Sequence, residues 1–135
     1  MPIPAPRVIA RRATGGTYPG DAKRIGAARA NLRALLDGCP MADDVLLCAS
    51  ELATNAVLHS QSRLPGGTFT MRGKVSPGEY VWIAVADDGG PWTPAACDPE
   101  RGHGLDIIRT LADEWGIVGD PDGRTVWARF DWPST

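Results

Sequence analysis

The sequence has no long apolar run that could cross a membrane. No segment of its 135 residues approaches the ~20 consecutive apolar residues that a transmembrane helix needs. The opening stretch, MPIPAPRVIARR, lacks the order of basic and then apolar residues that marks a signal peptide. We therefore expect a cytoplasmic protein that makes no membrane contact.

Cysteine and unbalanced charge are also scarce. The three cysteines, Cys39, Cys48 and Cys97, are odd in number and form no CxxC pair, which argues against a disulfide framework or a zinc site. The 14 Lys and Arg residues nearly balance the 16 Asp and Glu residues, and neither sign forms a run. This balance gives no electrostatic footprint for direct nucleic-acid binding.

The length and the distribution of proline indicate one domain with a loose start. A chain of 135 residues can close one two-layer core but not two independent ones. Residues 1–7 contain three prolines and are expected to be a flexible arm. The domain itself is expected to span residues 8–132, with residues Val8–Thr17 as a candidate edge strand.

Three segments have the apolar spacing of helices. The first follows Asp21, a suitable N-cap, and is ended by Gly38. The second runs from about Ala42 to His59 and is the most apolar segment of the chain. Residues Gly104–Glu114 are predicted to form the third helix.

Two hairpins are predicted between and after these helices. Their strands are Thr68–Val75 with Glu79–Asp87, and Trp115–Gly119 with Arg124–Trp132. Helices and antiparallel hairpins in this order predict an α+β two-layer sandwich, in which about three helices cover one face of a mixed, mostly antiparallel sheet. Tryptophans on the strands, which are Trp82, Trp115 and Trp127, are expected to pack in the core.

The stretch SELATNAVLHS places two polar residues, Glu51 and Asn55, one helical turn apart in an apolar segment. At 100° per residue, they share one quarter of the helix circumference with Asp44, Cys48 and His59. A buried Glu without a partner is costly. The spacing alone leaves two readings open, a stripe that faces water and a stripe that binds something.

Two glycine-containing segments carry further chemistry. In VADDGG, a strand ends in Asp87 and is followed by Gly89. In RGHGL, Gly102 and Gly104 stand immediately before a helix, where exposed backbone N–H groups and the helix dipole favour phosphate oxygens. Each segment alone is weak evidence, because acid and glycine clusters are most often plain turns.

Taken together and in this order, the three segments resemble the GHKL (Bergerat-fold) ATPases, and in particular the small anti-sigma-factor serine/threonine kinases. The resemblance runs from about Tyr18 to Phe130. ELATNAVLH resembles the family's N box, VADDGG its first glycine box, GHGLDIIRTLADEWG its second, and GRTVW its closing strand.

The resemblance implies an ATP and Mg²⁺ site. Glu51 would be the catalytic general base, and Asn55 would bind both ATP and Mg²⁺ through its amide oxygen. Asp87 would accept a hydrogen bond from the adenine amino group, and Gly89 would give the base room. Thr125 would lie near the adenine, although it can equally be an ordinary strand residue.

The remaining implied contacts are to the phosphates. Gly102 and Gly104 would hold them, Leu105 would pack behind, and residues 88–101 would form the ATP lid. Arg101 and His103 are further ATP-binding candidates, each with an ordinary surface role as the alternative. The roles of His59 and Trp92 stay open.

The resemblance also implies a function. We expect an ATP-dependent protein serine/threonine kinase that phosphorylates an anti-anti-sigma (STAS-domain) partner, binds a sigma factor, and forms a homodimer. The alternative is a nucleotide-binding module that regulates a partner by sequestration without phosphoryl transfer, which the short lid favours. The chain shows no helical hairpin with a phosphoacceptor His, so we do not expect a complete sensor kinase.

Overall fold

The computed structural model describes residues 12–59, 65–88, 104–120 and 123–133. The strands are β1 (Arg12–Pro19), β2 (Thr68–Ser76), β3 (Tyr80–Asp87), β4 (Glu114–Asp120) and β5 (Gly123–Asp131). The α-helices are α1 (Ile25–Leu35), α2 (Ala42–His59) and α3 (Gly104–Leu111), and the short 3₁₀ helix η1 (Ala22–Arg24) leads into α1.

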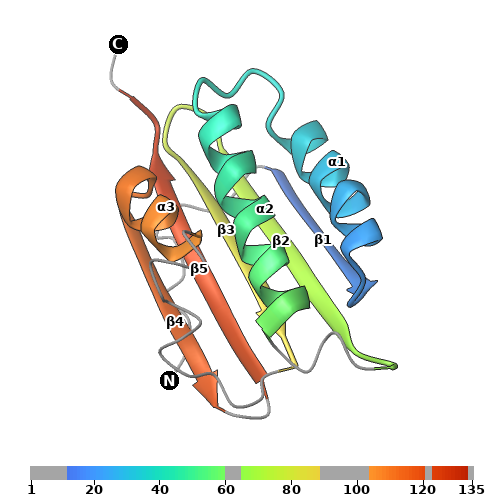
Figure 1. The fold of residues 1–135 in the computed structure, drawn as a ribbon. Coiled ribbons are helices and arrows are strands. Elements are labelled where there is room, and N and C mark those ends of the chain that lie inside the picture. The colour runs from blue at the N-terminus through green and yellow to red at the C-terminus, as the bar shows by residue number, and fades with distance from the viewer. Residues whose placement is uncertain (1–11, 60–64, 89–103, 121–122, 134–135) are drawn as a thin grey trace.

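The strands form a single sheet in the order β1-β2-β3-β5-β4. Every neighbouring pair in this order is antiparallel. All three α-helices cover the same face of the sheet (Figure 1). The predicted α+β two-layer sandwich is therefore confirmed. An edge strand was expected at Val8–Thr17, and β1 lies at the edge but runs from Arg12 to Pro19, while residues 8–11 are outside the described residues. No helix in the described ranges is long and apolar enough to cross a bilayer.

The first helix forms where the sequence predicted it. The side chain of Asp21 accepts a hydrogen bond from the backbone N–H of Lys23 (3.0 Å) and caps η1. After α1, Gly38 adopts a positive φ of 78°, a conformation that favours glycine. On β2, a Cβ at Gly73 would lie 2.8 Å from the Leu32 side chain, so the missing side chain lets α1 rest directly on the sheet.

The third helix is shorter than predicted. It ends at Leu111 rather than Glu114. The backbone N–H of Ala112 still bonds to the carbonyl of Ile108 (2.8 Å), but the N–H of Asp113 bonds to the carbonyl of Arg129 in β5 (2.9 Å). Ala112 and Glu114 are good helix formers, yet the bond from Asp113 to β5 ends the helix and Glu114 begins β4, since tertiary contacts outweigh weak local preferences.

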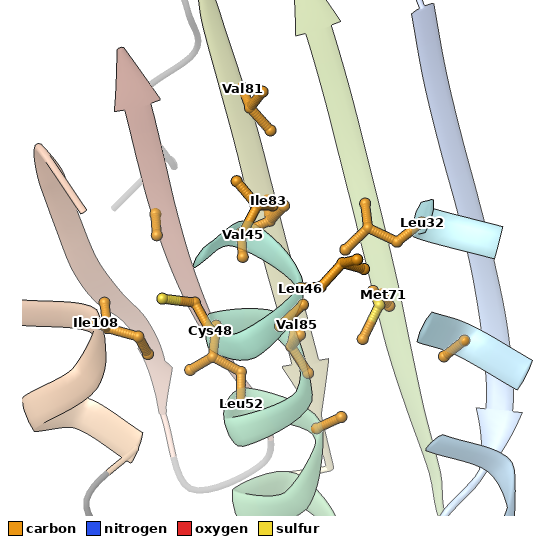
Figure 2. Close-up of a cluster of buried hydrophobic side chains, with 14 of the residues drawn as sticks. Leu32, Val45, Leu46, Cys48, Leu52, Met71, Val81, Ile83, Val85 and Ile108 are labelled. Atoms are coloured by element: carbon orange, nitrogen blue, oxygen red, sulfur yellow. The ribbon is translucent and has the colours of Figure 1, made fainter. Parts of the chain in front are cut away.

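The two faces of the sheet are packed separately. On the helix-covered face, Val81, Ile83 and Val85 of β3 join the main core beneath α2 (Figure 2). On the opposite face, a second cluster is formed by Tyr80, Trp82, Ala84 and Trp127. Trp82 and Trp127 are thus buried as predicted, and Trp115 packs partly buried against the main core.

Candidate functional site

Helix α2 supplies the acid and the amide. Leu52 is buried against the sheet, whereas Glu51 and Asn55, on a neighbouring side of the helix, are half-buried. No hydrogen bond or ion pair joins either polar side chain to another residue of the described chain. A half-buried carboxylate and amide without partners among the described residues are suited to meet a ligand, because polar groups inside proteins are normally hydrogen-bonded.

The predicted polar stripe of α2 is interrupted at Cys48. Its side chain is fully buried, on the side of α2 that meets Ile108 of α3 (Figure 2). Burial raises the pKa of the Cys48 thiol to about 12, and the charges of Asp44 and Glu51 raise it further. The prediction that Cys48 shares the polar face is therefore corrected, because α3 covers this position.

The last two turns of α2 lie over the end of β3. The helix and the strand run in the same direction, with Val45 beside Ile83 near the middle of the strand (Figures 1 and 2). From Val45 to Asn55 the helix rises about 15 Å. From Ile83 to Asp87 the strand advances about 14 Å. The last turns of α2, which contain Asn55, and the end of β3, which is Asp87, therefore lie toward the same end of the sandwich (Figure 1), which we call the Asp87 end.

Helix α3 points its first turn toward the same end. It finishes just before Glu114, where β4 starts near the Tyr80 end of the sheet. Ile108, in the middle of α3, lies level with Cys48 (Figure 2). Gly104 and Leu105 therefore lie on the Asp87 side of Ile108, and Leu105 is buried in the main core.

Asp87 has a neighbour that sequence reasoning missed. Arg124 is its direct cross-strand partner on β5, and the Arg124 Nε lies 3.6 Å from the Asp87 Oδ1. The exposed fractions of the two side chains are only 8% and 11%. The GRTVW segment contains this arginine immediately before Thr125, but only the register of β5 on β3 shows that it meets Asp87.

Thr125 lies on the other face of the sheet. It is paired with Ala86 on β3 and with Val118 on β4, and directly opposed residues in an antiparallel pair point to the same side. Side chains alternate along a strand, so Thr125 and Arg124 point in opposite directions. The structure brings Arg124, and not Thr125, beside Asp87.

Asp88, the first residue of the predicted lid, has a structural role. Its Oδ2 accepts a hydrogen bond from the backbone N–H of Thr68 (2.9 Å), which ties the end of β3 to the start of β2. The other predicted positions in this region lie outside the described residues, and so does the side chain of His59. They are Gly89, Trp92, Arg101, Gly102, His103 and the remainder of the lid up to residue 101.

A hollow of about 270 Å³ lies between α2 and α3 and is distinct from the predicted site. It is lined by Leu47, Asp106, Ile107, Thr110 and Leu111. None of these is a predicted site residue, and Leu47 belongs to the outer face of α2, where it is 43% exposed.

The chemistry of Asn55 suits a magnesium ion. The amide oxygen of Asn55 is a hard ligand of the kind that Mg²⁺ accepts, and the ion commonly takes one or two protein oxygens and completes its shell with phosphates and water. Asn55 makes no bond to another described residue that would have to be broken first.

The chain belongs to a known family. Residues 18–130 match the histidine kinase-like ATPase domain, a range that contains α2, β3, α3 and all of β5 but its last residue. This membership agrees with the resemblance that the N box and the glycine boxes indicated, and it implies ATP binding.

Individual proteins add to this assignment. Blue-light-activated histidine kinase 2 of Erythrobacter litoralis (strain HTCC2594) is 35% identical over 95 residues, which cover 67% of this chain and 27% of the relative. The crystal structure of the RsbU and RsbW domains of Rv1364c from Mycobacterium tuberculosis superposes with a TM-score of 0.70 at 21% identity, covering 91% of this chain and 34% of that chain. The chain thus spans about a quarter to a third of these proteins.

Proposed function

We propose that the protein is an ATP- and Mg²⁺-dependent serine/threonine kinase that phosphorylates an anti-anti-sigma (STAS-domain) partner and also binds a sigma factor. The catalytic unit would be the single domain of residues 8–132. The likeness of the fold to a structure described as containing an RsbW domain supports this class of partner.

One observation carries the proposal. Glu51 and Asn55 are half-buried, lie one turn apart on α2, and bind no other described residue, at the end of the sandwich where β3 ends in Asp87. An acid beside an amide at this position suits phosphoryl transfer, which needs a base for the acceptor hydroxyl and an oxygen ligand for the metal.

The proposed step is a direct displacement. The hydroxyl oxygen of the partner's Ser or Thr forms a bond to the γ-phosphorus, the bond from that phosphorus to the β,γ-bridging oxygen breaks, and ADP leaves. Glu51 accepts the hydroxyl proton. Asn55 would hold the Mg²⁺, which neutralises phosphate charge when bound. Asp87 would bind the adenine, and Gly102 and Gly104 the phosphates.

Transfer is tested with labelled ATP, Mg²⁺ and a purified STAS-domain protein from the same cell. Glu51→Gln keeps the size and polarity of the side chain but removes the base, so we expect the transfer rate to fall by about 10²-fold or more. Glu79→Gln, an exposed site at the β2–β3 turn, is the matched control. Equal rates for wild type and Glu51→Gln would refute the role of Glu51.

Binding is tested separately from transfer. A ligand that binds only the native state raises the melting temperature, so ATP with Mg²⁺ should stabilise the wild type. Asn55→Ala should lose most of the Mg²⁺-dependent part of this stabilisation. If the wild type gains nothing from ATP or ADP, the proposed site is wrong. ATP binding without transfer to any STAS protein would instead favour a module that regulates by sequestration.

A further inference from the structure

Arg124 and Asp87 form a buried ion pair at the Asp87 end of the sandwich. They are direct partners across β3 and β5 and lie on the helix-covered face. The next residues on this face are Val85 on β3 and Val126 on β5, which pair with each other. Arginine is almost never fully buried unless it is paired, and the Arg124 side chain is only 8% exposed. Its charge is thus held where the proposed nucleotide base would bind.

The pair presents two kinds of hydrogen-bonding group side by side. Asp87 offers acceptor oxygens, and a carboxylate has about four acceptor sites. Arg124 offers only donors, in a rigid planar fork. The Nε lies 3.6 Å from the Oδ1, so the donor and acceptor groups stand next to each other.

We propose that Arg124 is a specificity-determining residue that donates a hydrogen bond to the N1 atom of adenine, while Asp87 accepts one from the neighbouring amino group. The inference rests on the proposed nucleotide site and adds a second residue that recognises the base. Adenine presents an N–H donor and a ring acceptor next to each other, and an acid with an arginine is complementary to both.

A purely structural ion pair makes a different prediction. If Arg124 only neutralised Asp87, its removal would weaken the binding of every nucleotide that uses Asp87, whatever atom stands at position 1 of the ring. If Arg124 reads N1, its contribution disappears for a ligand that lacks this acceptor. The two possibilities can be distinguished by comparing the affinities for two ligands, without comparing the stabilities of variants.

The test compares ATP with 1-deaza-ATP, in which a C–H group replaces N1, for the wild type and Arg124→Met. We expect Arg124→Met to weaken ATP binding roughly tenfold or more, as for the loss of a hydrogen bond to a charged donor, and to leave the affinity for 1-deaza-ATP nearly unchanged. Arg129→Met is the matched control, because Arg129 is on the same strand but faces the other side of the sheet.

The outcomes separate this inference from the proposed function. Equal losses of affinity for both ligands, or tighter ATP binding in Arg124→Met, would overturn the role of Arg124 while leaving the ATP site intact. A wild type that binds neither nucleotide would overturn the proposed function and this inference with it.

Arg124→Lys guards against a folding artefact. It keeps the positive charge beside Asp87 and N–H donors but loses the planar fork, so it should fold and retain a preference for ATP over 1-deaza-ATP that is smaller than in the wild type. Unfolding of each variant in the absence of nucleotide shows whether the comparison is between folded proteins. A folded Arg124→Lys protein with the full wild-type preference would contradict a role for the guanidinium fork.

Discussion

The two faces of β3 use the same strand for different purposes. On the helix-covered face, Val81, Ile83 and Val85 pack beneath α2 and lead to Asp87 at the end of the strand. On the opposite face, Tyr80, Trp82 and Ala84 pack with Trp127 and lead to Ala86. One face therefore ends in an ion pair at the candidate site, and the other ends in a methyl group.

This difference follows from the two-residue period of a strand. A shift of one residue in the pairing of β3 with β5 would exchange the faces and would place Thr125 where Arg124 lies. The register therefore decides which side chain can meet the nucleotide. The residues that only stabilise and the residues that can bind are separated by a single position along the chain.

Truncating the core of the helix-covered face should have the largest effect. Leu52 is 2% exposed, so Leu52→Ala should lower the free energy of unfolding by about 2–5 kcal/mol. Leu47 is on the outer side of the same helix, and Leu47→Ala should change it by less than about 0.5 kcal/mol. Denaturant unfolding measures both, and similar losses would mean that α2 is oriented differently on the sheet.

The buried thiol on the same face should make stability fall at high pH. Between the ordinary thiol pKa of 9.0 and the raised pKa of about 12, the Cys48 thiol stays protonated in the folded protein but ionises in the unfolded chain. The free energy of unfolding should therefore decrease as the pH rises, by roughly 1.4 kcal/mol per pH unit from this group.

Cys48→Ala provides the control for that decrease. The variant has no thiol to titrate, so its stability should fall less steeply over the same pH range. Denaturant unfolding at several pH values gives both slopes, and identical slopes would show that the Cys48 thiol is not buried as described.

The face without helices should respond more weakly. The Lys74 ammonium lies 5.2 Å from the centroid of the Trp82 ring. Lys74→Met should lower the free energy of unfolding by about 0.5–1 kcal/mol through the lost cation–π contact, whereas Lys74→Arg should retain most of it. Equal effects of the two substitutions would remove the cation–π explanation.

Thr125 should give the smallest effect and the sharpest contrast with Arg124. Thr125→Val keeps the shape of the side chain on the face away from Asp87, so we expect ATP affinity to stay within about twofold and stability within about 0.5 kcal/mol. A tenfold loss of ATP affinity would restore the adenine contact that the family resemblance implied for Thr125.

Much of the architecture could be predicted because it depends on local patterns. The bounds of α2, the hairpin of β2 and β3, and the capping role of Asp21 follow from apolar periodicity and turn residues. The end of α3 could not be predicted in this way. The local sequence favours a longer helix, whereas the hydrogen bond from Asp113 to Arg129 depends on β5, which lies further along the chain.

The candidate site shows the same distinction between local patterns and contacts of distant segments. Glu51, Asn55 and Asp87 were predicted from the sequence, because the motifs that resemble the family are short segments in which helical spacing and the position at a strand end can be recognised. Burial of Cys48 and the pairing of Arg124 with Asp87 were decided only when α3 packed on α2 and β5 paired with β3. Contacts between segments distant in the chain depend on register and packing, which a local pattern does not encode.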